Sequence, residues 1–145
     1  MWPEVEVSCK INISIKKAWD AYVAETDQWW PKSMYTSPET KRFVFENKLG
    51  GMLYEDFGSG QGLVWGTIIG LTKPHQVLWK GTLSKDFGGP ATTIETLKFK
   101  AEDKITEVTY RIDFVGVVDQ KTRLSLKEGW QMILDKHYKP YCENL

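Results

Sequence analysis

The chain has 145 residues, and its 19 Lys and Arg balance 19 Asp and Glu, so the formal net charge at pH 7 is zero. This length favours one domain with a substantial core, and 41% hydrophobic with 26% charged residues is typical of globular rather than disordered chains. Zero net charge argues against a general attraction to nucleic acid or to an anionic membrane. The unusual feature is the 13% aromatic content, which includes seven Trp.

The cysteine pattern and the first residues indicate a cytoplasmic protein. Cys9 and Cys142 do not form a disulfide framework, and no Cys/His cluster has zinc-site spacing. The first ten residues lack the basic and apolar regions of a signal peptide, and no run approaches the ~18 apolar residues of a membrane span. We expect reduced thiols, no metal and no membrane association.

A strand and two short helices are predicted at the start of the chain. Residues 4–13 alternate between polar and apolar side chains, which is typical of a half-buried strand. Ser14 is a suitable N-cap for a helix over residues 15–25. A second short turn or helix around Trp29 ends at Pro31.

Six further strands are predicted in the middle of the chain. They are separated by turns rich in glycine, proline and acidic residues, and their spacing is typical of an antiparallel meander. The expected ranges are residues 42–47, 52–57, 63–69, 76–83, 92–100 and 105–115. In residues 92–100 the apolar side chains Ile94, Leu97 and Phe99 depart from period two, which indicates a bulge near Glu95 and Thr96.

A long helix is predicted from residue 119 or 120 to residue 139. Its apolar stripe follows i, i+3, i+4 spacing and consists of Leu126, Trp130, Ile133, Leu134, His137 and Tyr141. Pro140 is expected to kink or end this helix just before itself. Gly129 costs about 1 kcal/mol relative to Ala inside a helix, so we expect close packing against a neighbour there.

These elements predict an α+β fold in which a curved antiparallel sheet of about seven strands surrounds one long C-terminal helix. A single amphipathic helix covers only part of a concave sheet. The rest of that face is either filled by side chains or left as a cavity.

The order of elements resembles the helix-grip fold of the START-like (SRPBCC) superfamily, which is related to the Bet v 1 fold. Short motifs further resemble the activator of heat-shock-protein-90 ATPase homologue C-terminal-like family. These motifs lie at residues 18–21, 27–30, 50–51, 66–68, 73–79 and 129–130. Together they span nearly the whole chain in the family order.

The resemblance implies binding of a small hydrophobic or amphipathic ligand between the sheet and the C-terminal helix, without a cofactor. Some proteins of this fold are cyclases, so a cyclase-like or hydrolase-like enzyme acting in that cavity is the first alternative. A chaperone-associated interaction module is the second, although true co-chaperones of the family carry an additional N-terminal domain. Exposed sheet edges would allow a homodimer, but nothing in the sequence predicts one.

The aromatic excess is interpreted as the wall of this cavity. Core packing alone would explain most of these rings, but a rigid aromatic pocket explains their number better. In this fold the short helices close one mouth of the cavity. The candidate lining residues are Trp19, Trp30, Phe45, Trp65, Trp79, Tyr110, Ile112, Phe114, Trp130, Leu134 and His137.

His137 is the most distinctive polar candidate, because it lies on the apolar stripe of the long helix. It is either a histidine at the edge of the core, bonded to a neighbour, or an anchor or proton-transfer group for a ligand. No nucleophile–base pair is apparent, so binding is favoured over catalysis.

Acidic residues also interrupt the apolar strands. We expect most of Glu46, Asp56 and Glu95 to lie on the outer face or in ion pairs. A carboxylate facing inward would need a partner such as Arg111 or Arg42, because an unpaired buried charge is costly.

Overall fold

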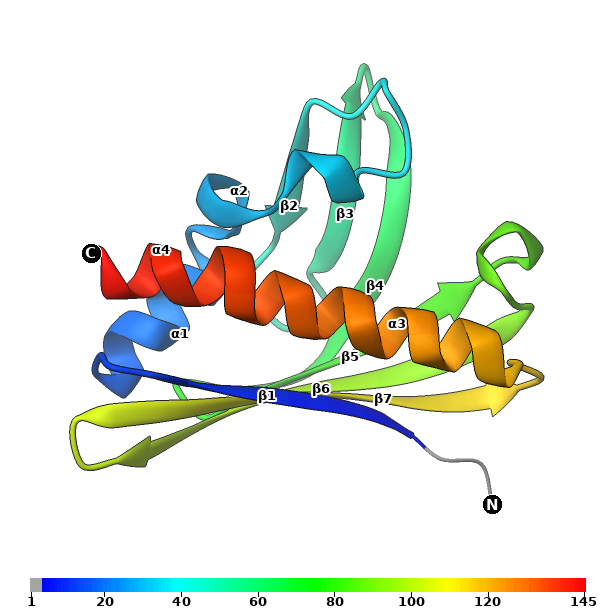
Figure 1. Ribbon diagram of the computed structural model, residues 1–145. Helices are drawn as coiled ribbons and strands as arrows, with labels where there is room; N and C mark the ends of the chain where they lie inside the picture. Colours follow the sequence, from blue (N-terminus) through cyan, green and yellow to red (C-terminus); the bar gives the residue numbers. More distant parts are fainter. Residues whose placement is uncertain (1–3) are drawn as a thin grey trace.

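A seven-stranded antiparallel sheet curls around the C-terminal helix in the computed structural model, which describes residues 4–145 (Figure 1). Of the seven Trp residues, Trp2 lies outside the described residues. The sheet order is β1-β7-β6-β5-β4-β3-β2. The strands are β1 Val5–Ile11, β2 Arg42–Phe45, β3 Met52–Gly58, β4 Gln61–Thr72, β5 Gln76–Leu83, β6 Ala91–Glu102 and β7 Ile105–Gly116. The helices are α1 Ile15–Val23, α2 Thr26–Trp29, α3 Gln120–Met132 and α4 Lys139–Glu143.

The predicted strand and helix at the start of the chain are confirmed. Alternate residues of β1 are buried and exposed, and its buried face contributes Ile11 to the core. The side chain of Ser14 caps α1 by accepting a hydrogen bond from the backbone N–H of Lys17 at 3.3 Å. The first strand then pairs with the last, since Cys9 lies opposite Val108, so strands that are about 100 residues apart in the sequence lie side by side in the sheet.

The predicted bulge near Glu95 and Thr96 is wrong. Glu95 lies opposite Trp79 on β5 and Ile112 on β7, and neither pairing has a register shift there. Thr93 and Glu95 occupy inward positions of a regular strand, so the period-two pattern is intact. It looked broken only because two of its inward residues are polar.

The C-terminal helix crosses the concave face of the sheet and does not stop at Pro140 (Figure 1). A π-helical segment, Ile133–Tyr138, joins α3 to α4, and Pro140 lies in the first turn of α4. The wider π turn immediately before Pro140 accommodates a residue that has no backbone N–H. The same segment shifts the buried stripe by one position, so that Tyr138 is fully buried and His137 is only half-buried.

The expected close packing at Gly129 is also absent from the described structure. A Cβ atom at this position would meet only the terminal methyl of Met34, at an ordinary 3.6 Å. The packing around α3 therefore sets no steric requirement for glycine at position 129.

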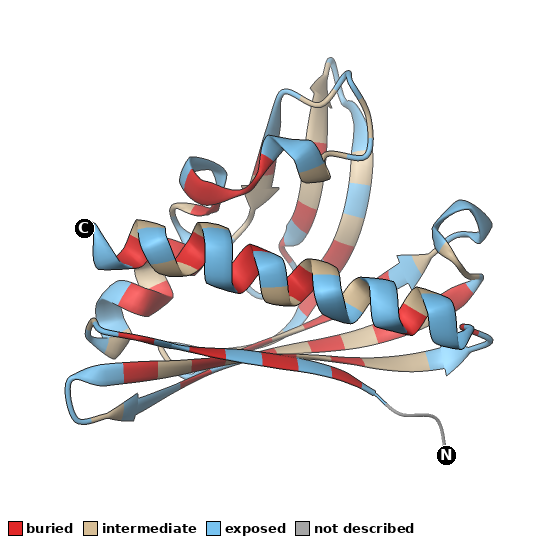
Figure 2. Ribbon diagram, in the orientation of Figure 1, coloured by how far each residue is buried: buried red, intermediate tan, exposed pale blue. Residues whose placement is uncertain are grey.

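Buried residues gather along α1, α2 and the C-terminal helix (Figure 2), and aromatic side chains make up much of the core there. The ring of Tyr22 contacts those of Trp29 and Tyr138, each with a centroid separation of 5.0 Å. The hydroxyl of Tyr138 donates a hydrogen bond to the Ala18 carbonyl at 2.5 Å, which ties the C-terminal helix to α1. Any large cavity must therefore lie towards the N-terminal half of α3.

Candidate functional site

A cavity of about 790 Å³ lies between α3 and the inner face of β4, β5, β6 and β7. The short 3-10 turn Lys85–Phe87, which connects β5 to β6, forms part of its wall. The cavity is half-open, and its apolar lining includes Leu63, Trp65, Ile112, Phe114, Leu126 and Trp130. Hydroxyl groups from the connecting turns and from α3 add polar positions around these side chains.

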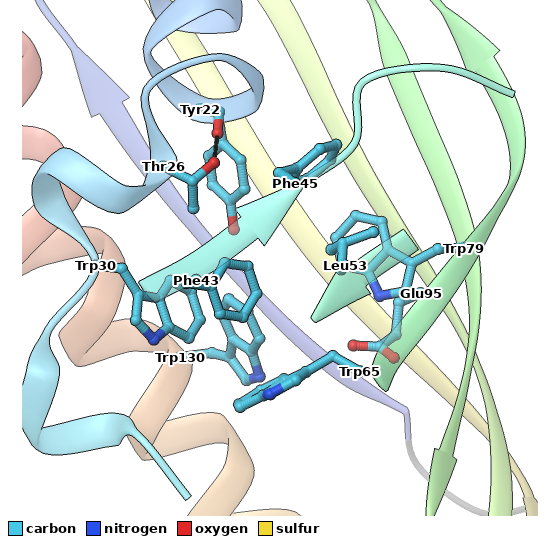
Figure 3. Close-up of a pocket in the computed structure, with 10 residues that line it drawn as sticks. All are labelled: Tyr22, Thr26, Trp30, Phe43, Phe45, Leu53, Trp65, Trp79, Glu95 and Trp130. Atoms are coloured by element: carbon cyan, nitrogen blue, oxygen red, sulfur yellow. Dashed lines mark hydrogen bonds between the residues drawn. The ribbon is translucent and has the colours of Figure 1, made fainter. Parts of the chain in front are cut away.

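A second cavity, with room for about one water molecule, shares part of its lining with the first, and Figure 3 shows the residues that enclose it. Its volume is about 10 Å³, and aromatic rings enclose most of it. Trp30 stacks on Phe43 with a centroid separation of 4.4 Å and meets Trp130 edge-to-face at 5.6 Å. Trp65, Trp130 and Glu95 line both cavities and therefore form the wall between them.

Glu95 is the acidic group in this shared wall, and the residue is only 8% exposed. Its carboxyl accepts hydrogen bonds from the hydroxyl of Tyr110 and from the hydroxyl of Thr93, the latter at 2.7 Å. Burial raises the pKa of Glu95, and hydrogen bonds from Tyr110, Thr93 and Trp79 offset part of that rise. Figure 3 shows this carboxyl beside the rings of Trp65 and Trp79.

Two glycines on adjacent strands make room for this carboxyl. Gly66 and Gly81 lie directly opposite each other on β4 and β5. A Cβ at Gly66 would come within 2.5 Å of the Trp79 ring. A Cβ at Gly81 would come within 2.7 Å of the carboxyl of Glu95 and the hydroxyl of Thr93. The pair thus forms a depression in the sheet that seats Trp79 and Glu95.

A second buried carboxyl, that of Glu55, supports the same wall. It accepts hydrogen bonds from the Trp65 indole N–H at 2.7 Å, the Thr40 hydroxyl at 2.7 Å and the Thr36 backbone N–H at 2.9 Å. Three donors match an acceptor-only carboxylate. These bonds fix the orientation of Trp65 and hold the segment before β2 against β3.

The arginines proposed as partners for an inward acid lie elsewhere. Arg42 pairs with Asp56 at 3.1 Å, and Arg111 pairs with Asp113 at 2.9 Å. These pairs confirm that Asp56 is ion-paired and that Arg111 faces outward. The expected arginine partner for an inward acid is wrong for Glu95, whose hydrogen-bond donors are neutral hydroxyl and indole groups.

The structure brings most of the predicted lining residues to the two cavities. The larger cavity includes Trp65, Ile112, Phe114 and Trp130, and the smaller includes Trp30, Phe45, Trp65, Trp79 and Trp130. The predicted residues outside both cavities are Trp19, Tyr110, Leu134 and His137. Tyr110 is fully buried behind Glu95, and Trp19 and Leu134 belong to the core.

Sequence reasoning missed Glu55 and Thr93 and did not identify Glu95 as the acid that faces inward. Strict counting of alternate positions from Phe99 back through Leu97 would have found Glu95 and Thr93 on the inner face. For Glu55 no sequence pattern suffices, because its donors come from a segment of irregular structure before β2.

Acidic side chains outnumber basic ones in the lining of the larger cavity. Asp86, Glu95 and Asp119 line it together with Lys121. The backbone N–H of Thr122 donates to Asp119 at 2.7 Å and lowers the pKa of that carboxyl, which keeps a negative charge at the start of α3.

Arg123 is a buried cation that lies against the ring of Phe114, which is one of the lining residues. Its guanidinium carbon is 4.6 Å from the ring centroid. Its Nε donates a hydrogen bond to the Val118 carbonyl at 3.1 Å, which directs the guanidinium towards the backbone before α3. Arg123 itself is not among the residues that line the cavity.

Two general features of residues 4–145 bear on the kind of site. Within that range no helix is both long enough and apolar enough to cross a membrane. The same residues contain no cluster of three or more His, Cys, Asp or Glu side chains positioned to hold a metal ion.

Solved structures with this fold cover nearly the whole chain, although no protein-family model and no curated protein sequence matches it. DynU16, from the dynemicin biosynthetic locus, is 16% identical with a TM-score of 0.70 over 97% of this chain, which spans about half of DynU16 (47%). CalU16 from Micromonospora echinospora is 13% identical with a TM-score of 0.67 over 95% of this chain and 73% of its own. An AHSA1-like protein from Aeromonas hydrophila is 22% identical with a TM-score of 0.65 over 96% of this chain and 92% of its own. These likenesses establish the helix-grip architecture.

Proposed function

We propose that this chain binds a small hydrophobic or amphipathic molecule in the larger cavity, without a cofactor. The supporting observation is the half-open space of about 790 Å³ under α3, within the roughly 300–1,000 Å³ typical of ligand sites. Its walls combine apolar side chains with a few polar groups, which is the usual composition of such sites. Helix-grip proteins often bind hydrophobic ligands, and zero net charge fits an uncharged or amphipathic ligand better than a polyanion. The cytoplasmic location expected from the cysteine pattern belongs to the same proposal.

The sequence motifs and the AHSA1-like structural neighbour support a place for this chain in the activator of heat-shock-protein-90 ATPase homologue C-terminal-like family. This assignment belongs to the same proposal, because the structural likeness alone extends only to the fold.

One observation favours catalysis as a second candidate function. Glu95 is a buried carboxyl with a raised pKa in the wall of the cavity, a combination that is enriched among general acids and bases. A cyclase-like or hydrolase-like reaction on a bound hydrophobic substrate would use it for proton transfer. Native mass spectrometry of protein isolated from cells separates the two functions: an unchanged bound molecule supports binding, and its turnover supports catalysis.

The binding proposal is tested by filling the cavity from two sides. The double variant Leu63→Trp/Ser125→Trp places indole rings at two lining positions, on β4 and α3. The matched control Ile69→Trp/Glu128→Trp makes the same kind of change at exposed positions of β4 and α3 outside the lining. The assay is fluorescence titration with N-phenyl-1-naphthylamine, an uncharged apolar probe, with circular dichroism to confirm folding.

We expect the cavity-filling variant to bind the probe at least about tenfold more weakly than the wild type, and the control to bind it normally. His137→Leu is expected to retain wild-type affinity, because His137 lies outside both cavities. Failure of the wild type to bind the probe, or equal weakening in both double variants, would contradict the proposal.

A further inference from the structure

We propose that the preferred ligand is an organic cation, in which an apolar body carries a protonated amine that lies beside Glu95. This inference rests on the proposed function and specifies the class of ligand for the same cavity. Three features of the described residues support it: the environment of the Glu95 carboxyl, the aromatic rings around that carboxyl, and the signs of the charges that line the cavity.

The first feature is that Glu95 occupies the wall of the cavity with neutral hydrogen-bond partners. Tyr110 and Thr93 hold the carboxyl in place through their hydroxyl groups, and Trp79 contributes its indole. Burial disfavours the ionised form of this group, so an incoming ammonium would supply the positive charge that its surroundings lack. Binding of the cation and ionisation of Glu95 would then favour each other.

The second feature is the aromatic surface around the carboxyl. Trp65 and Trp130 line both cavities together with Glu95, and the faces of such rings attract cations. The indole N–H of Trp65 donates to the carboxylate of Glu55 at 2.7 Å. This hydrogen bond increases the electron density of the indole ring and strengthens its attraction for a cation. Glu55 thus acts on the ligand through Trp65 rather than by contact.

The third feature is the balance of charge along the lining. Asp86 and Asp119 add to the negative potential of Glu95, and Lys121 is the basic side chain among the lining residues. Arg123 lies behind the ring of Phe114, with its Nε bonded to a backbone carbonyl. An anionic ligand would face three carboxyls in this space, whereas an ammonium would be attracted by them.

The test compares three ligands that share one aromatic body and differ in the charge of the head group: 1-naphthylmethylamine, 1-naphthylmethanol and 1-naphthylacetate. Their affinities are measured by isothermal titration calorimetry at pH 7.5 with the wild type, with Glu95→Gln and with the control Glu128→Gln. Glu128 is exposed on α3 and lies outside the cavity lining.

We expect the wild type and Glu128→Gln to bind the amine at least about tenfold more tightly than the alcohol, with the acetate weakest. In Glu95→Gln the preference for the amine over the alcohol should fall to the smaller part that Trp65, Trp130 and the two remaining acidic side chains supply, with the affinity for the alcohol unchanged. If Glu95→Gln does not fold, the comparison of the three head groups in the wild type is sufficient to test the preference for a cation.

Equal or tighter binding of the alcohol or the acetate by the wild type overturns the cation inference and leaves the proposed ligand site intact. Retention of the full wild-type preference for the amine in folded Glu95→Gln also overturns it. If the wild type binds neither the three naphthyl compounds nor N-phenyl-1-naphthylamine, the proposed function itself fails.

Discussion

Glu95→Gln should make the stability of the protein less dependent on pH. The substitution keeps the size of the side chain and removes a buried group that ionises. Burial raises the pKa of Glu95 above its ordinary value of 4.5, so the folded protein binds this proton more tightly than the unfolded chain does. The stabilisation from this proton is complete below pH 4.5, and it is lost as the pH rises through the raised pKa.

The magnitude follows from linkage. Between pH 4.5 and the pKa of Glu95 in the folded protein, the unfolded chain has released a proton that the folded protein retains. The free energy of unfolding of the wild type therefore falls by about 1.4 kcal/mol per pH unit in this window from Glu95 alone. Asp56 and Asp119 have lowered pKa values and act with the opposite sign, losing stability as the pH falls. Both residues remain in the variant, so their contribution cancels when the unfolding free energy of the wild type is subtracted from that of Glu95→Gln.

The assay is urea unfolding of the wild type and Glu95→Gln at half-unit steps from pH 4 to pH 8. We expect the free energy of unfolding of the variant, relative to that of the wild type, to rise with pH above 4.5 and then to level off. A difference that stays flat, or that falls with pH, would refute the reasoning. If the variant does not fold, a carbon-13 NMR titration of the Glu95 carboxyl in the wild type reports the same pKa directly.

Further substitutions test the packing around this site. Gly129→Ala should raise the free energy of unfolding by about 1 kcal/mol, because a Cβ has space in the middle of α3; a loss of stability in thermal unfolding would contradict this. Gly81→Ala should lower the free energy of unfolding by roughly 1–3 kcal/mol in the same assay, because the Cβ would collide with a backbone carbonyl of β4 at 2.7 Å. A neutral effect would show that the strands around Gly81 move apart to accept the extra methyl group. Tyr138→Phe should cost roughly 1 kcal/mol through loss of its buried hydrogen bond, and an unchanged urea midpoint would argue against that bond. Burial raises the pKa of Cys9 and Cys142 to about 12, so both thiols should resist iodoacetamide at pH 8 until urea unfolds the chain, and rapid labelling of the folded protein by mass spectrometry would disagree.

Local patterns in the chain were sufficient for the main elements of the fold. The alternation before Ser14, the cap itself and the glycine-rich turns between strands act over a few residues, and the structure has these elements close to their expected bounds. The aromatic residues Trp65, Trp79 and Trp130 were associated with a cavity by the same kind of reasoning, because their strands and helix had been identified.

The π-helical segment before Pro140 is a feature that local sequence patterns do not predict. A helical repeat of 3.6 residues places His137 on the buried stripe, but one wider turn before Pro140 buries Tyr138 instead. Its hydroxyl bonds to Ala18, 120 residues away in the sequence, so the choice of buried residue depends on a contact between distant elements.

The sequence by itself determined the order of strands and helices, the curled sheet and the aromatic character of its interior, because propensity, capping and alternation depend on neighbouring residues. Only the tertiary structure decided which end of the concave face is filled, and that Glu95 lies in the cavity wall. The depression that seats Glu95 needs Gly66 and Gly81 opposite each other on two strands, and its hydroxyl donors include Tyr110 on a third. The register between strands that are distant in the chain creates this arrangement, and no local pattern records it.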